Sequence, residues 1–320
     1  MYFITDLVMY DNLNMRLTCM EVGNVNFLDE ITKFCDKVIT HIYPNGEYSY
    51  TGILGNLSIS INRNSIAIKD GSFCKWLLGN NLQTMGRNDV KMGIEKLSDI
   101  LHLPMNKVIV YRIDIAQNIM LKHPIGVYLS HLGYYRNIKP SEQPNGIYYY
   151  QNNMLFCLYD KIKEQKDKKN IIPELFQKRN CLRLELRCKK RLADILKRES
   201  ITGTLLYDEA FYFEMVNLWG NYYRSIQKIN DIQMNFKVIK TVTDFRRSSL
   251  LDWIEQNGGQ TTIISNIKNA QKRKELTSKQ AYDFKKEVEA IYNIENGFTC
   301  PNEAIIELDQ KVGEIIKYQS

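Results

Sequence analysis

The sequence predicts an α+β fold, in which a mixed, mainly antiparallel β-sheet is flanked by helices and followed by a helical C-terminal part. Three observations predict it. Apolar and polar residues alternate in several short runs before residue 190, as in half-buried strands. Between these runs, apolar residues recur at helical spacing. From about residue 231 the pattern is mostly helical and more polar. We therefore expect an α+β body over residues 1–235 and a helical region over residues 236–320.

The first half of the body is expected to combine a hairpin, a helix and a long strand. Residues 57–62 alternate between apolar and polar, and an Arg-Asn-Ser turn then leads into Ile66-Ala67-Ile68, which predicts the hairpin. A helix capped by Asn88 should follow, with its apolar residues on one face, and should end before Pro104. Alternation resumes at residues 107–116, which predicts a strand.

The second half of the body repeats this mixture. Pro124 suits the first turn of a helix that we expect to reach about Tyr134. Residues 147–160 predict a second hairpin, turned by Gln-Asn-Asn, and residues 181–188 predict another strand. Apolar and aromatic residues at helical spacing then predict a long amphipathic helix over residues 205–229.

The composition is that of an ordinary globular protein, with 44% hydrophobic and 25% charged residues. A mainly disordered chain is therefore excluded. No run approaches the roughly 18 apolar residues of a membrane span, so no membrane partner is expected. The opening residues do not form a signal peptide, and the seven scattered cysteines include no CxxC pair. These features favour a reducing, cytoplasmic location.

Positive charge is concentrated in one part of the chain. The net charge is +7, whereas residues 161–198 alone contain 14 Lys and Arg against 5 Asp and Glu. Clustered cations suit a polyphosphate partner, because each neutralised phosphate releases counterions. A nucleic-acid partner is therefore favoured. For the segment KIKEQKDKK, a solvated lysine-rich loop is an equal alternative.

Two predicted strands each place several charged residues on one face. Arg112 and Asp114 share a face of one strand, and Arg183, Glu185 and Arg187 share a face of the other. An unpaired buried charge costs several kcal/mol. These groups therefore either pair with one another on a solvated face, or surround an ion and a polyanion. Both interpretations remain open at this point.

A third predicted strand leads into the spacing Tyr159-x-Lys161-x-x-Glu164. A tyrosine hydroxyl has a pKa of about 10 and attacks readily only when a cation or metal stabilises its phenolate. Lys161 would lie beside Tyr159 on the same face. Carboxylates prefer Mg²⁺ or Mn²⁺, for which Asp114 and Glu185 are natural ligands and Glu164 a third. Tyrosine is also a common strand residue, so the spacing alone does not decide.

Several segments resemble, in the same order, the replication initiators of the filamentous-phage gene II/X type, the phage replication protein CRI family. These segments are GSFCKWLLGNNLQ, EKLSDIL, YRIDIAQN, LYDKIKE and LRLELR, within about residues 50–230. Their RxDxA, YxKxxE and RxE elements are also similar to those of rolling-circle plasmid initiators of the Rep_trans class. The resemblance implies a rolling-circle-initiator fold. It also implies a DNA strand transferase that nicks one strand at an origin and holds the 5′ phosphate on a tyrosine.

Carried onto this chain, the resemblance makes Tyr159 the nucleophile and Lys161 the motif lysine. The implied ligands of Mg²⁺ or Mn²⁺ are Asp114, Glu185 and Glu164. Asp160 remains an alternative to the last of these. The expected DNA-binding residues are basic: Arg112, Arg183, Arg187, Lys189, Lys190 and Arg191. The His-hydrophobe-His metal motif of many rolling-circle nickases is absent, which favours carboxylate ligands.

The expected partners are single-stranded or unwound origin DNA, a host helicase and a host polymerase, in the cytoplasm of a bacterial host cell. Two other functions remain open. A non-catalytic origin-binding or regulatory protein would use the same basic surface, and a metal-dependent nuclease would use the same carboxylates to activate water. The catalytic interpretation requires Asp114 and Glu185 on one side of the sheet, and a Tyr159 ring that is not sealed in an apolar interior.

Two further surfaces have both a functional and a structural interpretation. Residues 148–150 are consecutive tyrosines, which could stack on bases or simply pack in a strand. In the helical region, Arg246, Arg247 and the basic cluster 272–274 could recognise origin DNA, whereas a purely structural cap is the alternative.

Overall fold

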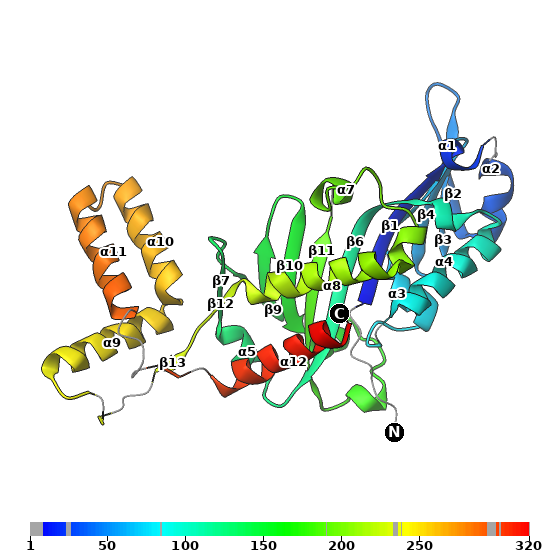
Figure 1. Cartoon of the computed structure of the whole chain (residues 1–320). Helices are drawn as coiled ribbons and strands as arrows, with labels where there is room; N and C mark the ends of the chain where they lie inside the picture. The colour runs from blue at the N-terminus through cyan, green and yellow to red at the C-terminus, as the bar shows by residue number, and fades with distance from the viewer. Residues whose placement is uncertain are drawn as a thin grey trace.

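A ten-stranded sheet forms the centre of the α+β body (Figure 1). The computed structural model describes residues 9–23, 27–83, 85–189, 191–232, 236–237, 239–292, 299–300 and 302–319. The strand order is β2-β3-β4-β5-β1-β6-β11-β10-β9-β8. These strands are β1 (Met9–Thr18), β2 (Asp36–Ile42), β3 (Tyr48–Leu54), β4 (Leu57–Asn62), β5 (Ser65–Lys69), β6 (Ile109–Leu121), β8 (Ser141–Gln143), β9 (Gly146–Tyr150), β10 (Met154–Asp160) and β11 (Asn180–Cys188).

Helices and short strands surround this sheet. The α-helices are α1 (Cys19–Val22), α2 (Phe27–Glu30), α3 (Phe73–Leu78), α4 (Arg87–Leu101), α5 (Ile125–Ser130), α6 (Lys161–Asp167), α7 (Leu192–Ile195), α8 (Glu209–Arg224), α9 (Val242–Gln256), α10 (Gly259–Lys272), α11 (Ser278–Tyr292) and α12 (Glu303–Gln319). The 3-10 helices are η1 (Ile31–Phe34), η2 (Met105–Lys107), η3 (Glu174–Phe176) and η4 (Thr204–Tyr207). Among the described residues, four short strands lie outside the main sheet: β7 (Leu132–Tyr135), β12 (Ile226–Lys228), β13 (Asp231–Ile232) and β14 (Thr299–Cys300).

The predicted α+β class is confirmed, and the sheet is more regular than expected. A mixed, mainly antiparallel sheet was the expectation, whereas every pair of neighbouring strands in the described sheet is antiparallel. Both predicted hairpins are present, as β4–β5 and β9–β10. The predicted helix before Pro104 is α4. It is capped by Gly86 rather than Asn88, and the Gly86 N–H donates to Asp89 Oδ2 at 2.8 Å.

Two predicted helices are shorter than their patterns indicated. α5 ends at Ser130, and the chain continues into β7 instead of remaining helical to Tyr134. α8 ends at Arg224, and β12 follows it. The reason is the same in both places, because β7 and β12 pair with each other in an antiparallel ladder. Such a pairing between distant segments overrides a local helical pattern.

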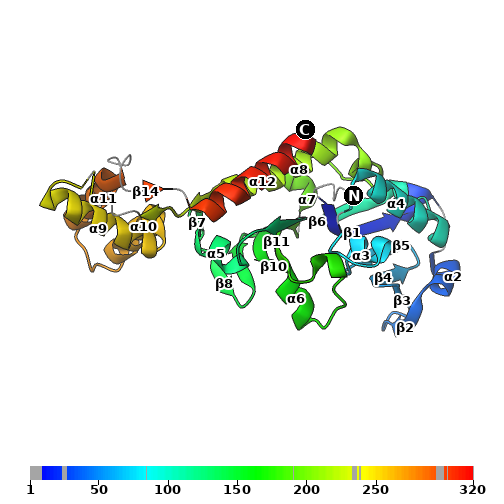
Figure 2. The same ribbon diagram turned by 90° about the horizontal axis from the view of Figure 1, so that it is seen from below.

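The main apolar core lies between the sheet and the helices on one of its sides. α8 and α12 run along this side, whereas α6 lies on the opposite side (Figure 2). The core includes Leu184 and Leu186 of β11 and the fully buried Trp219 of α8. The Trp219 indole N–H also donates to the Leu184 carbonyl oxygen at 3.2 Å. The apolar face predicted for the long helix is therefore used as expected, to cover the sheet.

Helices α9, α10 and α11 form a separate unit, which we call the helical module (residues 242–292). It has its own apolar core, formed by residues such as Leu251, Ile263 and Val288. The strands that lead into and out of it, β13 and β14, pair with each other in antiparallel orientation. Among the described residues, none of the helices has both the length and the apolar character that crossing a bilayer would need.

The structure divides the chain differently from the predicted boundary at residues 235/236. α12 belongs to the body, because it packs on α8 and contributes to the main core. Its core residues are Ala304, Ile305, Leu308, Val312, Ile315 and Ile316. The helical module is thus an insertion into the body, not a C-terminal domain.

Candidate active site on the polar face of the sheet

The side of the sheet opposite α8 and α12 carries the predicted site residues, in a pattern set by strand register. Tyr159 of β10 lies opposite Arg183 of β11. Two residues further along β11, Glu185 lies opposite Ala116 of β6. Two residues beyond that, Arg187 lies opposite Asp114 of β6. Residues two apart on a strand share a face. Asp114 and Glu185 are therefore diagonal neighbours on one side of the sheet, as the catalytic interpretation requires.

A bulge in β1 adds two residues that the sequence analysis missed. Tyr10 pairs with Ile115 and Leu13 pairs with Ile113, so two residues of β1 lie opposite Asp114 alone. Such a bulge interrupts the alternation of a strand. As a result, Asp11 and Asn12 both reach the polar network, where Asn12 Nδ2 donates to Asp114 Oδ2 at 3.0 Å. The two consecutive polar residues in the segment YDNL are the sequence signal of this bulge.

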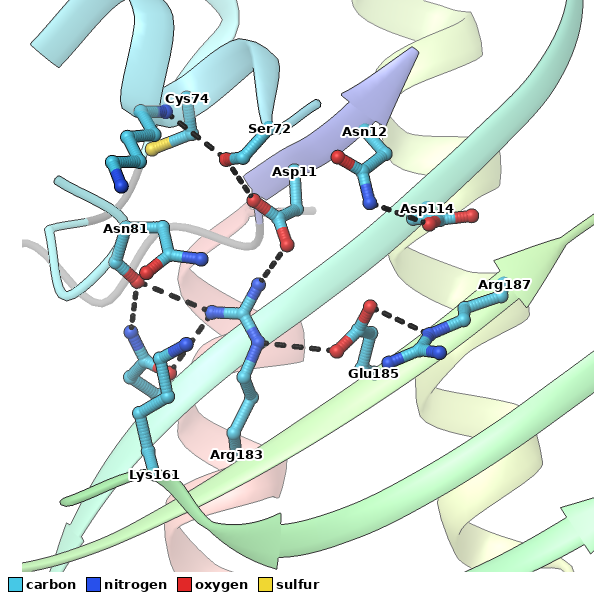
Figure 3. A network of polar contacts seen from close by, with 12 residues as sticks. Asp11, Asn12, Ser72, Cys74, Asn81, Asp114, Lys161, Arg183, Glu185 and Arg187 are labelled. Atoms are coloured by element: carbon cyan, nitrogen blue, oxygen red, sulfur yellow. Dashed lines mark hydrogen bonds and ion pairs between the residues drawn. The ribbon is translucent and has the colours of Figure 1, made fainter. Parts of the chain in front are cut away.

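Arg183 is the centre of the network (Figure 3). Its side chain is fully buried, with an exposed fraction of 0%. The guanidinium donates to Asp11 Oδ2 at 2.6 Å, to Glu185 Oε2 at 3.3 Å and to Asn118 Oδ1 at 3.1 Å. A further bond reaches the Asn81 carbonyl oxygen at 3.3 Å. Arg183 therefore balances the carboxylates from inside the protein.

The segment around α3 closes over this end of the network. The Ser72 hydroxyl donates to Asp11 Oδ1 at 2.5 Å and also caps α3. Asn118 Nδ2 donates to the carbonyl oxygens of Asn81 and Leu82, at 3.2 and 3.1 Å. These contacts hold residues 72–82 against the polar face. They also explain why Arg183 has no access to solvent.

Glu185 accepts hydrogen bonds on both carboxylate oxygens. Arg187 Nε donates to Oε1 at 2.8 Å, while Arg183 and the Tyr159 hydroxyl donate to Oε2. Burial alone would raise the pKa of Glu185, but the two arginines lower this pKa to about 2. Glu185 is thus a charged acceptor at every physiological pH.

Tyr159 lies in a buried position beside this carboxylate. Its exposed fraction is 6%, its ring packs with Leu155 and Cys157, and its hydroxyl donates to Glu185 Oε2 at 2.8 Å. Burial, followed by the nearby Glu185 charge, raises the pKa of Tyr159 well above its ordinary value. The phenol is therefore protonated at neutral pH. Its ring is enclosed by apolar side chains, so the requirement for a ring that is not sealed in an apolar interior is not met in this arrangement, and only the hydroxyl reaches the polar network.

Arg112 and Arg187 form the accessible edge of the site. Their side chains are 21% and 28% exposed. Arg112 contacts Asp114 with two bonds, Nε to Oδ1 at 2.9 Å and a terminal nitrogen to Oδ2 at 2.7 Å. Burial raises the pKa of Asp114, the nearby Glu185 adds to this effect, and the bond from Arg112 opposes it. Each of these partly exposed arginines is thus oriented by a buried carboxylate behind it.

The remaining predicted DNA-binding residues follow β11. Lys189 is exposed directly after the strand. Arg191 is exposed too and pairs with Asp194 at 2.6 Å. Lys190 lies outside the residues that the structure describes.

Two tyrosines of β9 lie next to Tyr159 and Glu185. Tyr148 and Tyr150 share one face of the strand, and their rings stack at a centroid distance of 6.2 Å and an angle of 20°. Tyr148 is opposite Cys157, which is itself opposite Glu185. Tyr150 is 53% exposed. The stacked pair therefore forms an accessible aromatic border of the site.

Lys161 and Glu164 pair with each other at the start of α6. Lys161 Nζ lies 3.0 Å from Glu164 Oε2 and 5.9 Å from the centre of the Tyr159 ring. Burial, with Arg183 nearby, lowers the pKa of Lys161. Burial would raise the pKa of Glu164, but Lys161 and Lys168 hold it below its ordinary value. Lys161 therefore lies close to the phenol, while Glu164 is engaged by lysines.

The predicted metal ligands do not converge on one point in this arrangement. Among the described residues, no group of three or more His, Cys, Asp or Glu side chains is placed to hold a metal ion. Arg112 engages both oxygens of Asp114, and Glu185 is bound by Tyr159 and two arginines. The donor set seen here is thus already neutralised by protein cations, and the requirement for Mg²⁺ or Mn²⁺ stays a prediction.

Comparison with known proteins identifies the family. No curated protein matches the chain. The model of the phage CRI family, which describes the N-terminal part of a replication-associated protein, matches residues 9–214, more than half of the chain. This range includes every strand of the ten-stranded sheet, and it confirms the resemblance drawn from the sequence motifs. The chain therefore belongs to the phage CRI family of replication-associated proteins.

Proposed function

We propose that the protein initiates rolling-circle replication by nicking one DNA strand at an origin and later rejoining it. Tyr159 attacks the scissile phosphate, so a new phosphate–tyrosine bond forms while the bond to the 3′ oxygen breaks. The phenol gives up its proton to solvent as it attacks, and the departing 3′ oxygen takes up a proton to leave as a hydroxyl, so no net proton is gained or lost. Reversal of the same exchange reseals the strand without a nucleotide cofactor, because the phosphotyrosine keeps the bond energy. A protein of this kind would act on DNA in the cytoplasm of its bacterial host.

The observation that carries this proposal is the surroundings of the Tyr159 hydroxyl. It belongs to the motif Tyr159-x-Lys161-x-x-Glu164, and it is part of a network that contains Arg183 and Arg187. Cations around a phenol favour its phenolate, and they stabilise charge that develops on phosphate oxygens. A purely structural tyrosine would not require so many paired charges around it.

The attack requires a change in the resting contacts of Tyr159. Its hydroxyl is bound to Glu185, and a carboxylate with a pKa of about 2 is a weak base. The phenol therefore has to leave Glu185 and turn toward the accessible edge, where Arg112 and Arg187 can bind a phosphate. Arginine suits this role, because its planar donors match two phosphate oxygens at once.

The unpaired strand would reach this edge over the stacked Tyr148 and Tyr150. Bases stack on aromatic rings whatever their sequence, and nearby cations bind the backbone. Tyr150 is more than half exposed and lies on the same face as Arg187. The border of the site thus has both components of a single-strand binding surface.

The test uses labelled, overlapping single-stranded oligonucleotides that cover the replicon encoding the protein, with and without Mn²⁺. We expect one oligonucleotide to yield a covalent protein–DNA adduct on a denaturing gel. Tyr159→Phe should abolish this adduct and leave DNA binding nearly unchanged, because only the nucleophilic oxygen is removed. Tyr150→Phe is the matched control and should still form the adduct. An adduct that persists in Tyr159→Phe would contradict the assignment.

The burial of Tyr159 favours a second candidate, an origin-binding protein without nicking activity. Such a protein would bind the same DNA through Arg112 and Arg187, and its wild type would yield no adduct. The same gel therefore distinguishes the two functions. Nicking without an attached protein would instead indicate a nuclease that activates water.

A further inference from the structure

The segment around the turn between α10 and α11 carries an excess of positive charge. Residues 266–286 contain 7 Lys and Arg against 2 Asp and Glu. Within this segment, Arg273 pairs with Glu275. Lys285 pairs with Glu289, which lies just beyond it. Five further lysines are exposed and have no carboxylate partner among the described residues: Lys268, Lys272, Lys274, Lys279 and Lys286. We call these five residues the lysine tip.

The position of the lysine tip separates it from the candidate active site. α10 ends at Lys272 and α11 begins at Ser278, so Lys272, Lys274 and Lys279 lie at the end of a helical hairpin. Lys268 and Lys286 lie further along the two helices. Figure 1 shows this hairpin at one end of the molecule, with its turn at the end that is far from α9. The site on β6, β10 and β11 lies near the middle of the sheet. One bound DNA would therefore have to extend well beyond the cut strand to reach both surfaces.

We propose that the lysine tip binds the phosphate backbone of double-stranded DNA beside the nick site. Duplex DNA carries one negative charge per about 1.7 Å of its axis, so it matches a dense cluster of exposed lysines. Lysine is a point charge without base preference, which suits a contact that positions the DNA and does not read its sequence. This inference rests on the proposed function only in naming the DNA as an origin.

The composition of the tip favours duplex DNA over a single strand. Surfaces for unpaired strands combine cations with several stacking aromatic rings. Near the tip, Tyr282 is 64% exposed and lies between Lys279 and Lys286 on one face of α11. Its hydroxyl can donate to a phosphate oxygen, as tyrosines do at DNA backbones. Phe284 of α11 is exposed too, at 50%, so two rings accompany five lysines here, whereas at the border the two rings of Tyr148 and Tyr150 accompany two arginines.

The attachment of the module supports a positioning role. Both connections to the body run through β13 and β14, which pair with each other. In addition, a Cβ atom at Gly259 would lie 2.4 Å from Gln227 Nε2, so the start of α10 packs closely on β12. The start of α10 is therefore in contact with the body, so a duplex bound by the hairpin would stay close to the body that holds the cut strand.

The experiment compares DNA binding of the full-length protein and a variant with a neutral tip, Lys272→Gln/Lys274→Gln/Lys279→Gln. The probes are a fluorescent duplex of about 30 base pairs and one of its strands alone, over a range of salt concentrations. We expect the duplex affinity to fall at least tenfold at about 0.1 M salt. The slope of log affinity against log salt should fall by about 2 to 3, because each lost phosphate contact contributes about 0.9. Affinity for the single strand should change less than about threefold, because that strand binds elsewhere.

A matched control removes the same charge from parts of the body outside the basic segment 161–198, through Lys33→Gln/Lys91→Gln/Lys107→Gln. These lysines are exposed too. The control should keep its duplex affinity. The inference is overturned if the tip variant keeps its duplex affinity, if it loses both probes equally, or if the control loses as much.

The outcome is independent of nicking. The tip variant should form the covalent adduct on single-stranded origin DNA as well as the wild type does. Absence of an adduct in both proteins would reject the proposed function, and a loss of duplex affinity would still support the tip as a duplex-binding surface.

Discussion

Arg183 and Glu185 are two positions apart on β11 and carry opposite charges at buried positions on the polar face of the sheet. The surrounding network contains equal numbers of carboxylates and guanidiniums. They are Asp11, Asp114, Glu185, Arg112, Arg183 and Arg187. Removing one partner of such a buried set typically costs about 3–5 kcal/mol, because a charge is left unpaired. A phosphate that enters the site must therefore compete with carboxylates for arginine.

At the residue scale, the low pKa of Glu185 predicts how stability depends on pH. A carboxyl whose pKa is about 2 when folded and 4.5 ordinarily stabilises the fold above pH 4.5. This contribution, up to about 3 kcal/mol, should be lost as the pH falls from about 5 to about 2. Burial raises the pKa of Asp114 and gives it the opposite dependence, which offsets part of the slope. Urea unfolding at a series of pH values measures the effect.

Glu185→Gln is the control for this prediction. The amide keeps the shape of the side chain but does not titrate, so the variant should lose less stability on acidification than the wild type. Equal slopes in the two proteins would show that Glu185 is not responsible.

Part of the site could be predicted from the alternation of residues within one strand at a time. The period of two placed Arg112 with Asp114, and Arg183 with Glu185, on shared faces, and the structure has them so. Asp11 was missed because the bulge in β1 becomes visible only against the register of β6. The burial of Tyr159 and Arg183 was missed for a similar reason, since burial depends on distant segments that fold over the strand.

At the element scale, the closeness of β9 and β10 makes Gly146 a sensitive position. A Cβ atom there would lie 2.1 Å from the Leu158 carbonyl oxygen and 2.5 Å from Tyr159 Cβ. Gly146→Ala should therefore push the two strands apart beside the candidate nucleophile. We expect a loss of about 1–3 kcal/mol in the free energy of unfolding, measured with denaturant, together with loss of adduct formation.

Gly126→Ala is the matched control. Gly126 lies in α5, and a Cβ atom there would have no neighbour within 4 Å. Alanine is the better helix former by about 1 kcal/mol, so this variant should be as stable as the wild type or more so. Similar losses at both positions would contradict the steric argument.

Elements with local signals were predictable, whereas those created by distant pairing were not. The hairpins β4–β5 and β9–β10 join neighbouring segments, so alternation and a turn were sufficient to locate them. β7 and β12 are about 90 residues apart, and each lies where the pattern continued a helix. Nothing within either segment indicates the other.

At the scale of the whole molecule, the insertion of the helical module was not visible in the sequence. The amphipathic pattern of α12 shows that one of its faces is buried, but it does not show against which core. The structure places that face on α8 and the sheet. The change to helical composition near residue 231 lies close to the start of the helical module, which ends before α12.

Because β13 and β14 pair with each other, we expect that the helical module can be removed without disturbing the body. Ile232 and Thr299 are partners in this pairing, so an Asn-Gly turn can join them in place of residues 233–298. We expect the shortened protein to keep its unfolding temperature within about 5 °C, because the main core is untouched. It should also form the adduct on single-stranded DNA and bind duplex DNA as weakly as the tip variant.

Removal of α12 instead is the contrasting control. It would expose the apolar face that α8 and α12 share, so this protein should be insoluble or melt at a much lower temperature. Equal solubility of the two shortened proteins would contradict the division of the chain described here.

The return of α12 to the body also has a consequence for biosynthesis. The ribosome releases the helical module before it releases α12, because α9, α10 and α11 precede that helix in the chain. Until α12 emerges, the apolar surface that it covers beside α8 is exposed to solvent. Chaperone binding during translation should therefore be strongest in the interval between the emergence of α8 and that of α12.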